Sequence, residues 1–160
     1  MTVIAWIVEG TWAACVDAVR AHAPRDDDVL LLHVTGPEAA DAARGAYAGL
    51  LGRSRPDRDP AVPLESLAAS AAERLLAGAA ARLDRPAILL DRTGRPEREV
   101  VSAAEGAALL VLARDGDRTR PGPHSLGPAT RFVVDHAPCP VLLVWPGPAP
   151  DPAAAPPPPA

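Results

Sequence analysis

The sequence contains no lysine, and all sixteen of its basic residues are arginine. This absence excludes the lysine of a phosphate-binding P-loop, a Schiff-base lysine and an amine nucleophile on a side chain. The twenty acidic residues outnumber the arginines and give a formal net charge of −4. No basic stripe outweighs the acids, so the composition argues against a nucleic-acid-binding protein.

Cysteines and long apolar runs are also scarce. Cys15 and Cys139 form no Cys-x-x-Cys pair, so a reduced, cytoplasmic chain is expected. No apolar run approaches the roughly 20 residues that span a bilayer, so no membrane association is expected. Residues 2–7 are too short for the apolar region of a secretory signal and lack its basic lead.

Abundant alanine and proline take the place of the missing residue types. With 160 residues, of which 48% are hydrophobic, the chain suits one domain with one core, and we place it at residues 1–145. Residues 146–160 are almost entirely Pro, Ala and Gly. This composition predicts a disordered, polyproline-like tail, with a docking peptide as the alternative.

Five short apolar runs are continuous rather than alternating, which is typical of strands buried on both faces of a parallel sheet. They cover residues 3–8, 29–34, 86–90, 109–112 and 141–144. Helical patterns lie between them, at residues 11–22, 37–51, 64–83, from 97 onward, and from 128 until Pro138. This alternation predicts an α/β fold with a doubly wound parallel sheet and right-handed crossovers.

Spacing within the helical patterns predicts their inner faces and their starts. Thr11 is the expected N-cap of the first helix, and Pro128 is the expected first residue of the last one. In the long helix the core face is expected to be formed by residues spaced by four. These are Leu67, Ala71, Leu75 and Ala79.

Ligands of such sheets bind beyond the carboxyl ends of strands, where the winding direction reverses. Two loops are therefore candidates for a site. One is the Glu9-Gly10-Thr11 turn after the first strand, and the other runs from Ala113 to Gly127 after the fourth.

Four motifs in this order resemble the universal stress protein family along residues 1–145. They are EGT after the first strand, LLHV in the second, the loop ARDG…LGPAT, and HAPCPVLLV at the end. The resemblance implies a five-stranded sheet of order 3-2-1-4-5, as in adenine nucleotide alpha hydrolase-like folds. It also implies a homodimer, often built through the last strand, here Val141–Val144, and bound ATP in some members only.

The nucleotide loop of this family reads Gly-x2-Gly-x9-Gly-Ser/Thr, and the chain departs from it. Ala113 stands at the first glycine, Gly116 at the second and Gly127 at the third, with ten residues between the last two. Pro128 stands at the Ser/Thr position. The resemblance also puts Glu9 where the family has Asp, and Val34 near the adenine. The implied nucleotide-binding residues are Val8, Glu9, Gly10, Thr11, Val34, Ala113, Arg114, Gly116, Gly127, Pro128, Ala129 and Thr130.

These departures weaken a phosphate site at the helix N-terminus, which binds anions through free backbone N–H groups. Pro128 offers neither an N–H nor a hydroxyl, and Ala113 adds a methyl group. Side chains of the loop could replace these donors, with Asp115 and Asp117 partly neutralising them. The candidate donors are Arg114, Arg118, Arg120 and His124. The alternative is an exposed charged loop.

No Ser-His-Asp arrangement and no metal-like spacing of His124 and His136 emerges, so no enzymatic activity is expected. His33 is interpreted as a satisfied core or rim histidine. Two functions remain: a dimeric regulatory domain of the stress response with weak ATP binding between the first and fourth strands, and a nucleotide-free dimerisation or interaction module. Phosphoryl transfer is a distant third, since no metal ligand or base can be assigned. The sequence names no protein partner.

Overall fold

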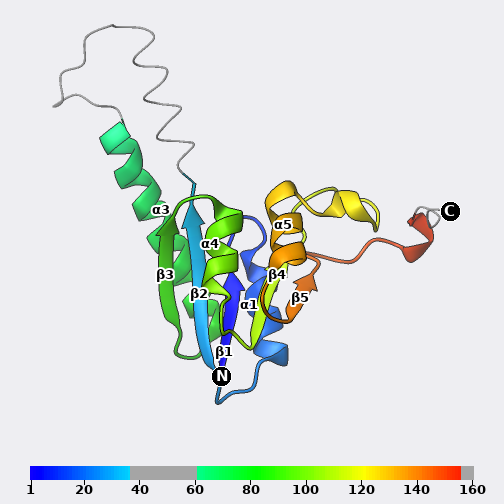
Figure 1. Ribbon diagram of the computed structural model, residues 1–160, viewed down its shortest axis with the longest axis horizontal. Coiled ribbons are helices and arrows are strands. Elements are labelled where there is room, and N and C mark those ends of the chain that lie inside the picture. Colours follow the sequence, from blue (N-terminus) through cyan, green and yellow to red (C-terminus); the bar gives the residue numbers. More distant parts are fainter. Residues whose placement is uncertain (37–60, 156–160) are drawn as a thin grey trace, which may run out of the picture.

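The computed structural model describes residues 1–36 and 61–155, and for residues 61–68 it describes the backbone only. Five parallel strands form one sheet in the order β3-β2-β1-β4-β5 (Figure 1). The strands are β1 (Thr2–Trp6), β2 (Asp28–Thr35), β3 (Ile88–Thr93), β4 (Leu109–Ala113) and β5 (Val141–Val144). The expected doubly wound sheet and its strand order are therefore confirmed.

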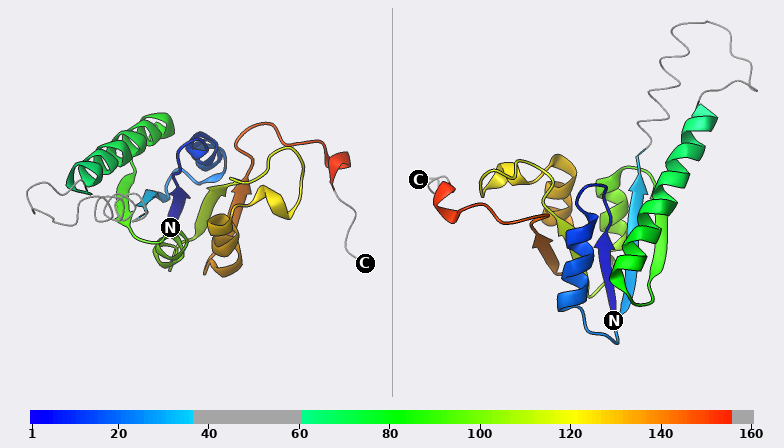
Figure 2. Two further views of the ribbon diagram at one scale, coloured as in Figure 1. Left: turned by 90° about the horizontal axis from the view of Figure 1, so that it is seen from above. Right: turned by 180° about the vertical axis from the view of Figure 1, so that it is seen from behind.

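Helices cover both faces of the sheet (Figure 2). The helices α1 (Trp12–His22) and α3 (Ala61–Leu83) pack against one face, and α4 (Pro96–Ala103) and α5 (Pro128–His136) pack against the other. The helix expected over residues 37–51, and most of the loop after it, lie outside the described residues. Pro63 lies in the first turn of α3, where its missing N–H costs no helical hydrogen bond.

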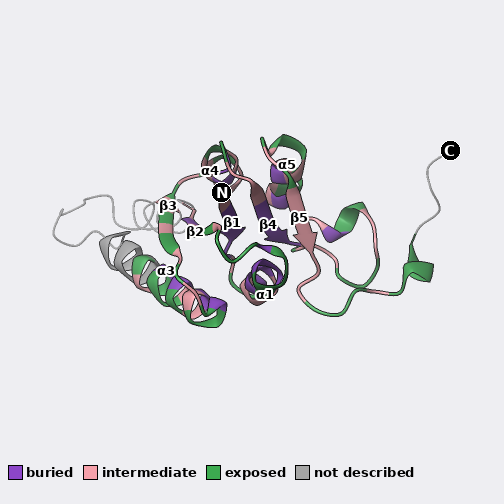
Figure 3. Ribbon diagram, turned by 90° about the horizontal axis from the view of Figure 1, so that it is seen from below, coloured by how far each residue is buried: buried purple, intermediate pink, exposed green. Residues whose placement is uncertain are grey.

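The core has two apolar layers because successive strand residues point to opposite faces. Val3 and Ala5 of β1 pack with α1 and α3, whereas Ile4 and Trp6 pack with α4 and α5. The central strands β1 and β4 are almost fully buried, as the sequence predicts (Figure 3).

The edge strand β3 departs from the prediction of a strand buried on both faces. Ile88 is 62% exposed and Leu89 is 45% exposed, because β3 has a neighbouring strand on one side only. The strand also begins later than expected and includes Asp91 and Arg92. A continuous apolar run therefore marks a strand here without showing that it is central.

The inner face of α3 is turned relative to the prediction. Its buried residues are Ala72, Leu76, Ala79 and Leu83. Ala71 is exposed and Leu75 is half-buried, while the side chain of Leu67 lies outside the described residues. A spacing of four overshoots the 3.6 residues of a helical turn, so a row spaced only by four drifts around the helix.

The helices start at or next to the predicted residues, but Thr11 does not make the predicted side-chain cap. Thr11 is the N-cap of α1, but its hydroxyl donates to the Val8 carbonyl at 3.3 Å instead of capping the helix. The helix α5 begins at Pro128, as predicted, and α4 begins at Pro96, one residue before the expected Glu97.

The carboxyl-terminal part of the chain lies beyond the edge strand β5, whose bounds match the prediction. In residues 146–155 the structure describes one short 3-10 turn, Pro152–Ala154, and no buried residue. No helix in residues 1–36 and 61–155 is both long and apolar enough to cross a membrane.

Candidate functional site

The turn between β1 and α1 occupies the carboxyl edge of the sheet, next to the loop that follows β4. The amides of Thr11 and Trp12 donate to the Val8 carbonyl at 3.1 and 2.9 Å. Gly10 has a φ of +80°, which fits the third position of a type II turn and favours glycine. Thr11 is buried, and Glu9 is exposed.

Three of the predicted site residues meet in one apolar cluster. Val34 of β2 is buried in the layer under α4 and α5, and Val8 and Ala129 pack against the same cluster. They come from three different elements, β2, the β1–α1 turn and α5. The structure thus places these three residues in the same apolar layer.

His33 precedes Val34 in β2 and is satisfied within the protein. Its Nδ1 is 2.8 Å from the Ile7 carbonyl oxygen. A carbonyl only accepts, so Nδ1 carries the hydrogen of this bond. The prediction of a satisfied histidine is confirmed, although β2 continues beyond His33 to Thr35.

The loop between β4 and α5 folds back on itself at Gly116. The Gly116 amide donates to the Ser125 carbonyl at 3.0 Å, and the Asp117 amide donates to the His124 carbonyl at 2.8 Å. A Cβ at position 116 would lie 2.3 Å from the His124 carbonyl oxygen. Glycine is therefore required here by the closure of the loop.

Asp115 occupies the start of α5. Its Oδ1 accepts the Gly127 amide hydrogen at 2.7 Å. A Cβ at Gly127 would lie 2.9 Å from Asp115 Oδ2, so the carboxylate rests against the glycine. The α5 ladder begins with the Arg131 amide, which donates to the Gly127 carbonyl at 2.9 Å. Pro128 has no N–H, which leaves the amides of Ala129 and Thr130 in the first turn.

Ala113 and Arg114 are positioned by the sheet and not by the loop. Ala113 ends β4 and is 6% exposed, with its methyl group in the layer under α1 and α3. The Arg114 guanidinium donates to the hydroxyl of buried Ser125, and its central carbon lies 4.6 Å from the centre of the Trp145 ring. Arg114 is therefore bound to other residues of the protein. Thr130, another predicted site residue, is buried.

Two other cations near the loop have internal contacts, whereas none is found for Arg118 in the described part of the chain. Arg120 lies 3.8 Å from Asp117. Asp117 also accepts hydrogen bonds from the amide and the hydroxyl of Thr119, at 2.9 and 2.6 Å. The pKa of Asp117 is lowered, mainly by the Thr119 hydroxyl bond. Arg131 donates to the Pro123 carbonyl.

Sequence reasoning missed the contact between Asp115 and Gly127. It treated Asp115 as a partner of loop arginines, and the twelve positions that separate it from Gly127 carry no periodic signal. The usable signal was the absence of Ser or Thr at the start of α5, which leaves the helix to find another acceptor for its amides. In the part of the chain that the structure describes, no group of three His, Cys, Asp or Glu residues could hold a metal ion.

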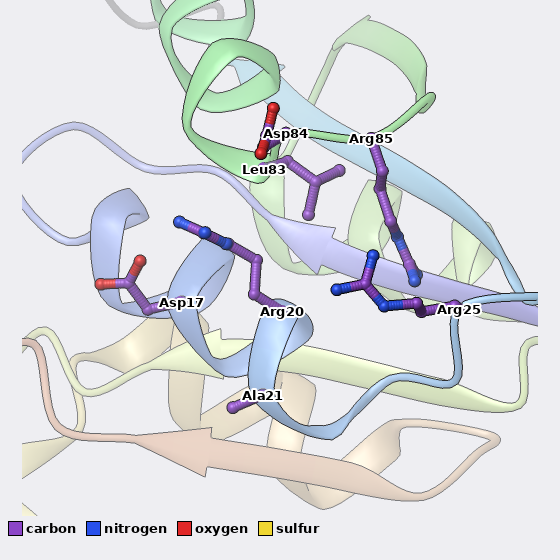
Figure 4. A pocket seen from close by; sticks show the side chains of 7 residues that line it. All are labelled: Asp17, Arg20, Ala21, Arg25, Leu83, Asp84 and Arg85. Atoms are coloured by element: carbon purple, nitrogen blue, oxygen red, sulfur yellow. The ribbon is translucent and has the colours of Figure 1, made fainter.

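A cavity of about 360 Å³ lies at the opposite, amino edge of the sheet (Figure 4). Among its lining residues are Asp17, Arg20 and Arg85. Arg20 donates to the Arg82 carbonyl at 3.2 Å, and Arg85 donates to the Pro24 carbonyl at 2.9 Å. These arginines hold chain segments at the carboxyl ends of α1 and α3, where cations suit the helix dipole.

Comparison with known proteins places the chain among known folds. The model of the Universal stress protein family matches residues 9–144. A universal stress protein in complex with cAMP superposes with a TM-score of 0.60 at 17% identity, covering 92% of this chain and 98% of that one. The universal stress protein UspA from Lactobacillus plantarum gives 0.57 at 20% identity, covering 90% and 97%. The Archaeoglobus fulgidus universal stress protein in complex with dAMP gives 0.53 at 15% identity, covering 89% and 96%.

These structural likenesses show the shared fold. No relative was found among the curated proteins.

Proposed function

Because the chain belongs to the universal stress protein family, we propose that it is a regulatory domain of the stress response that binds an adenine nucleotide or nucleoside. The ligand would lie at the carboxyl ends of β1 and β4. The protein would act in the cytoplasm. We further propose that two chains pair through β5. No catalytic activity is part of this proposal.

The observation that carries the proposal is that Val8, Val34 and Ala129 all belong to one apolar core layer. They come from the β1–α1 turn, β2 and the start of α5, near the edge where parallel sheets bind ligands. Apolar side chains beside a glycine turn suit a flat base such as adenine. Two proteins with this fold hold cAMP and dAMP, and both compounds carry a single phosphate.

The second candidate function is a nucleotide-free interaction module. It is favoured by the Asp115 carboxylate on the Gly127 amide, because that amide would otherwise be a phosphate donor. The two candidates differ in one measurable property, which is whether any adenine compound binds.

Isothermal titration with adenosine, AMP and Mg-ATP separates them. Pro128→Ser returns an N–H and a hydroxyl to the start of α5, next to the amide that Asp115 occupies. One added hydrogen bond to a charged phosphate contributes about 1.5–3 kcal/mol. We expect AMP binding to tighten by about tenfold or more, with adenosine unchanged. The matched control is Pro96→Ser, the same change at the same position of α4.

The control should leave every affinity unchanged. If neither the native chain nor Pro128→Ser binds any of the three compounds, the nucleotide-binding function is wrong and the interaction module stands. The variant Ala113→Gly is not used, because the Ala113 methyl group is buried in the core.

A further inference from the structure

We infer that Asp115 selects the ligand class at this site, so that the chain binds an adenine nucleoside in preference to a nucleoside triphosphate. This inference rests on the proposed function and concerns the phosphate end of the same site. It is carried by the contacts of Asp115, of the two loop glycines and of the surrounding cations.

The carboxylate of Asp115 stands where a phosphate would approach α5. It is 2.7 Å from the Gly127 amide nitrogen. Both of its oxygens lie within 3.0 Å of the position that a Cβ at residue 127 would take. A glycine opens the backbone to an incoming anion, and here the chain's own anion fills that opening. A phosphate group would have to displace it.

Two further loop amides are also bonded within the protein, whereas those of Ala129 and Thr130 remain in the first turn of α5. Gly116 and Asp117 donate to the carbonyls of Ser125 and His124, at 3.0 and 2.8 Å. Only glycine fits at position 116, because a Cβ there would clash with the His124 carbonyl oxygen. Both glycines retained from the nucleotide loop therefore have partners inside the protein, and Pro128 has no N–H to add.

The charges around Asp115 also favour a nucleoside over a triphosphate. No ion pair of Asp115 is found in the described part of the chain. Arg114 is held on Trp145 and Ser125, Arg120 lies against Asp117, and Arg131 donates to Pro123. A triphosphate would bring several negative charges to an uncompensated carboxylate, whereas a nucleoside brings none.

The variant Asp115→Asn tests the role of this carboxylate. Its amide oxygen can still accept the Gly127 amide hydrogen, so the loop keeps its bond while the charge is lost. In the native chain we expect ATP to bind at least about tenfold more weakly than adenosine. In Asp115→Asn we expect ATP to tighten by about tenfold while adenosine changes by less than about twofold.

Asp117→Asn is the matched control, because it removes the same charge two residues away, from a carboxylate that is bonded to Thr119. It should alter ATP affinity by less than about threefold. Titration calorimetry of the three proteins gives all of these affinities. The inference is wrong if native protein binds ATP more tightly than adenosine, or if both variants tighten ATP equally.

A second readout keeps the inference testable if no adenine compound binds to any of the proteins, which would reject the proposed function. Tripolyphosphate is titrated while the backbone amide resonance of Gly127 is followed by NMR. A saturable shift is expected in Asp115→Asn and is not expected in the native chain or in Asp117→Asn. The same response in all three proteins, or in none, would show that Asp115 does not keep phosphate away.

Discussion

At the scale of single residues, glycine and proline shape the loops at the carboxyl edge of the sheet. Gly10 supports the β1–α1 turn through its positive φ, and Gly116 allows the β4–α5 loop to close. Pro128 starts α5 and removes one donor from it. The closure of the loop is thus sufficient to explain a glycine at position 116.

The first prediction concerns Gly116. In Gly116→Ala the new methyl carbon would meet the His124 carbonyl oxygen at 2.3 Å, so the loop must move. We expect a loss of about 1–3 kcal/mol in the free energy of unfolding. Gly147→Ala is the control, since no atom lies within 4 Å of a Cβ there. Urea unfolding measures both variants, and equal stabilities would contradict the described loop.

The second prediction concerns the pH dependence of stability. Cys15 is fully buried, and burial raises the pKa of its thiol from 9.0 to about 12. Above the unfolded pKa the unfolded chain loses this proton while the folded chain keeps it, so stability falls as the pH rises. Between about pH 9 and 11 we expect a loss of about 1.4 kcal/mol per pH unit.

The absence of lysine makes this slope visible, because few other groups titrate in the same range. Cys15→Ala should lower stability at neutral pH, where the thiol is protonated in both states, and flatten the alkaline slope. Cys139→Ala should retain most of the slope, since Cys139 is only partly buried. Urea unfolding at a series of pH values decides, and an unchanged slope in Cys15→Ala would rule out Cys15 as its source.

Single-residue roles were predictable only where they depend on neighbours in sequence. Pro128 at a helix start follows from local stereochemistry. The hydroxyl of Thr11 was expected to cap α1 and instead donates to Val8. The Asp115–Gly127 contact depends on how the loop between β4 and α5 closes, which periodicity does not encode.

At the scale of elements, apolar patterning predicted the strands and most helices correctly. It did not predict whether a strand is central or at an edge of the sheet. The runs of β1 and β3 look alike in sequence, and only β1 has a strand on both sides. The edge position of β3 leaves Ile88 and Leu89 exposed. Strand order comes from long-range pairing, so a single run cannot reveal it; here the order was taken from the family resemblance.

The third prediction tests the inner face of α3. Leu76 is 4% exposed and lies in the core layer, whereas neighbouring Leu75 is half-buried. We expect Leu76→Ala to cost about 2–5 kcal/mol of unfolding free energy, as buried leucines do. Leu75→Ala is the matched control and should cost at least about 1 kcal/mol less. Similar losses in urea unfolding would favour the face spaced by four.

At the scale of the whole molecule, β3 and β5 are the two edge strands of the sheet in the described residues, and they differ in character. β3 exposes Ile88 and Leu89 to solvent, and all four residues of β5 are half-buried. An edge strand presents unpaired backbone groups that can pair with another chain. The proposed homodimer uses β5, where a two-fold axis would place the same strand of each chain together.

The last prediction therefore compares the two edges. Leu143 of β5 and Leu90 of β3 are both half-buried and pack against the same core layer. A lysine at either position should weaken the fold by a similar amount, because each loses comparable apolar contact. Only Leu143→Lys should also separate the dimer, since the two-fold axis would bring two of the new charges to the interface. Light scattering gives the mass of each protein, and urea unfolding gives its stability. A monomeric native chain would contradict the homodimer, and a dimer lost equally in both variants would contradict its placement at β5.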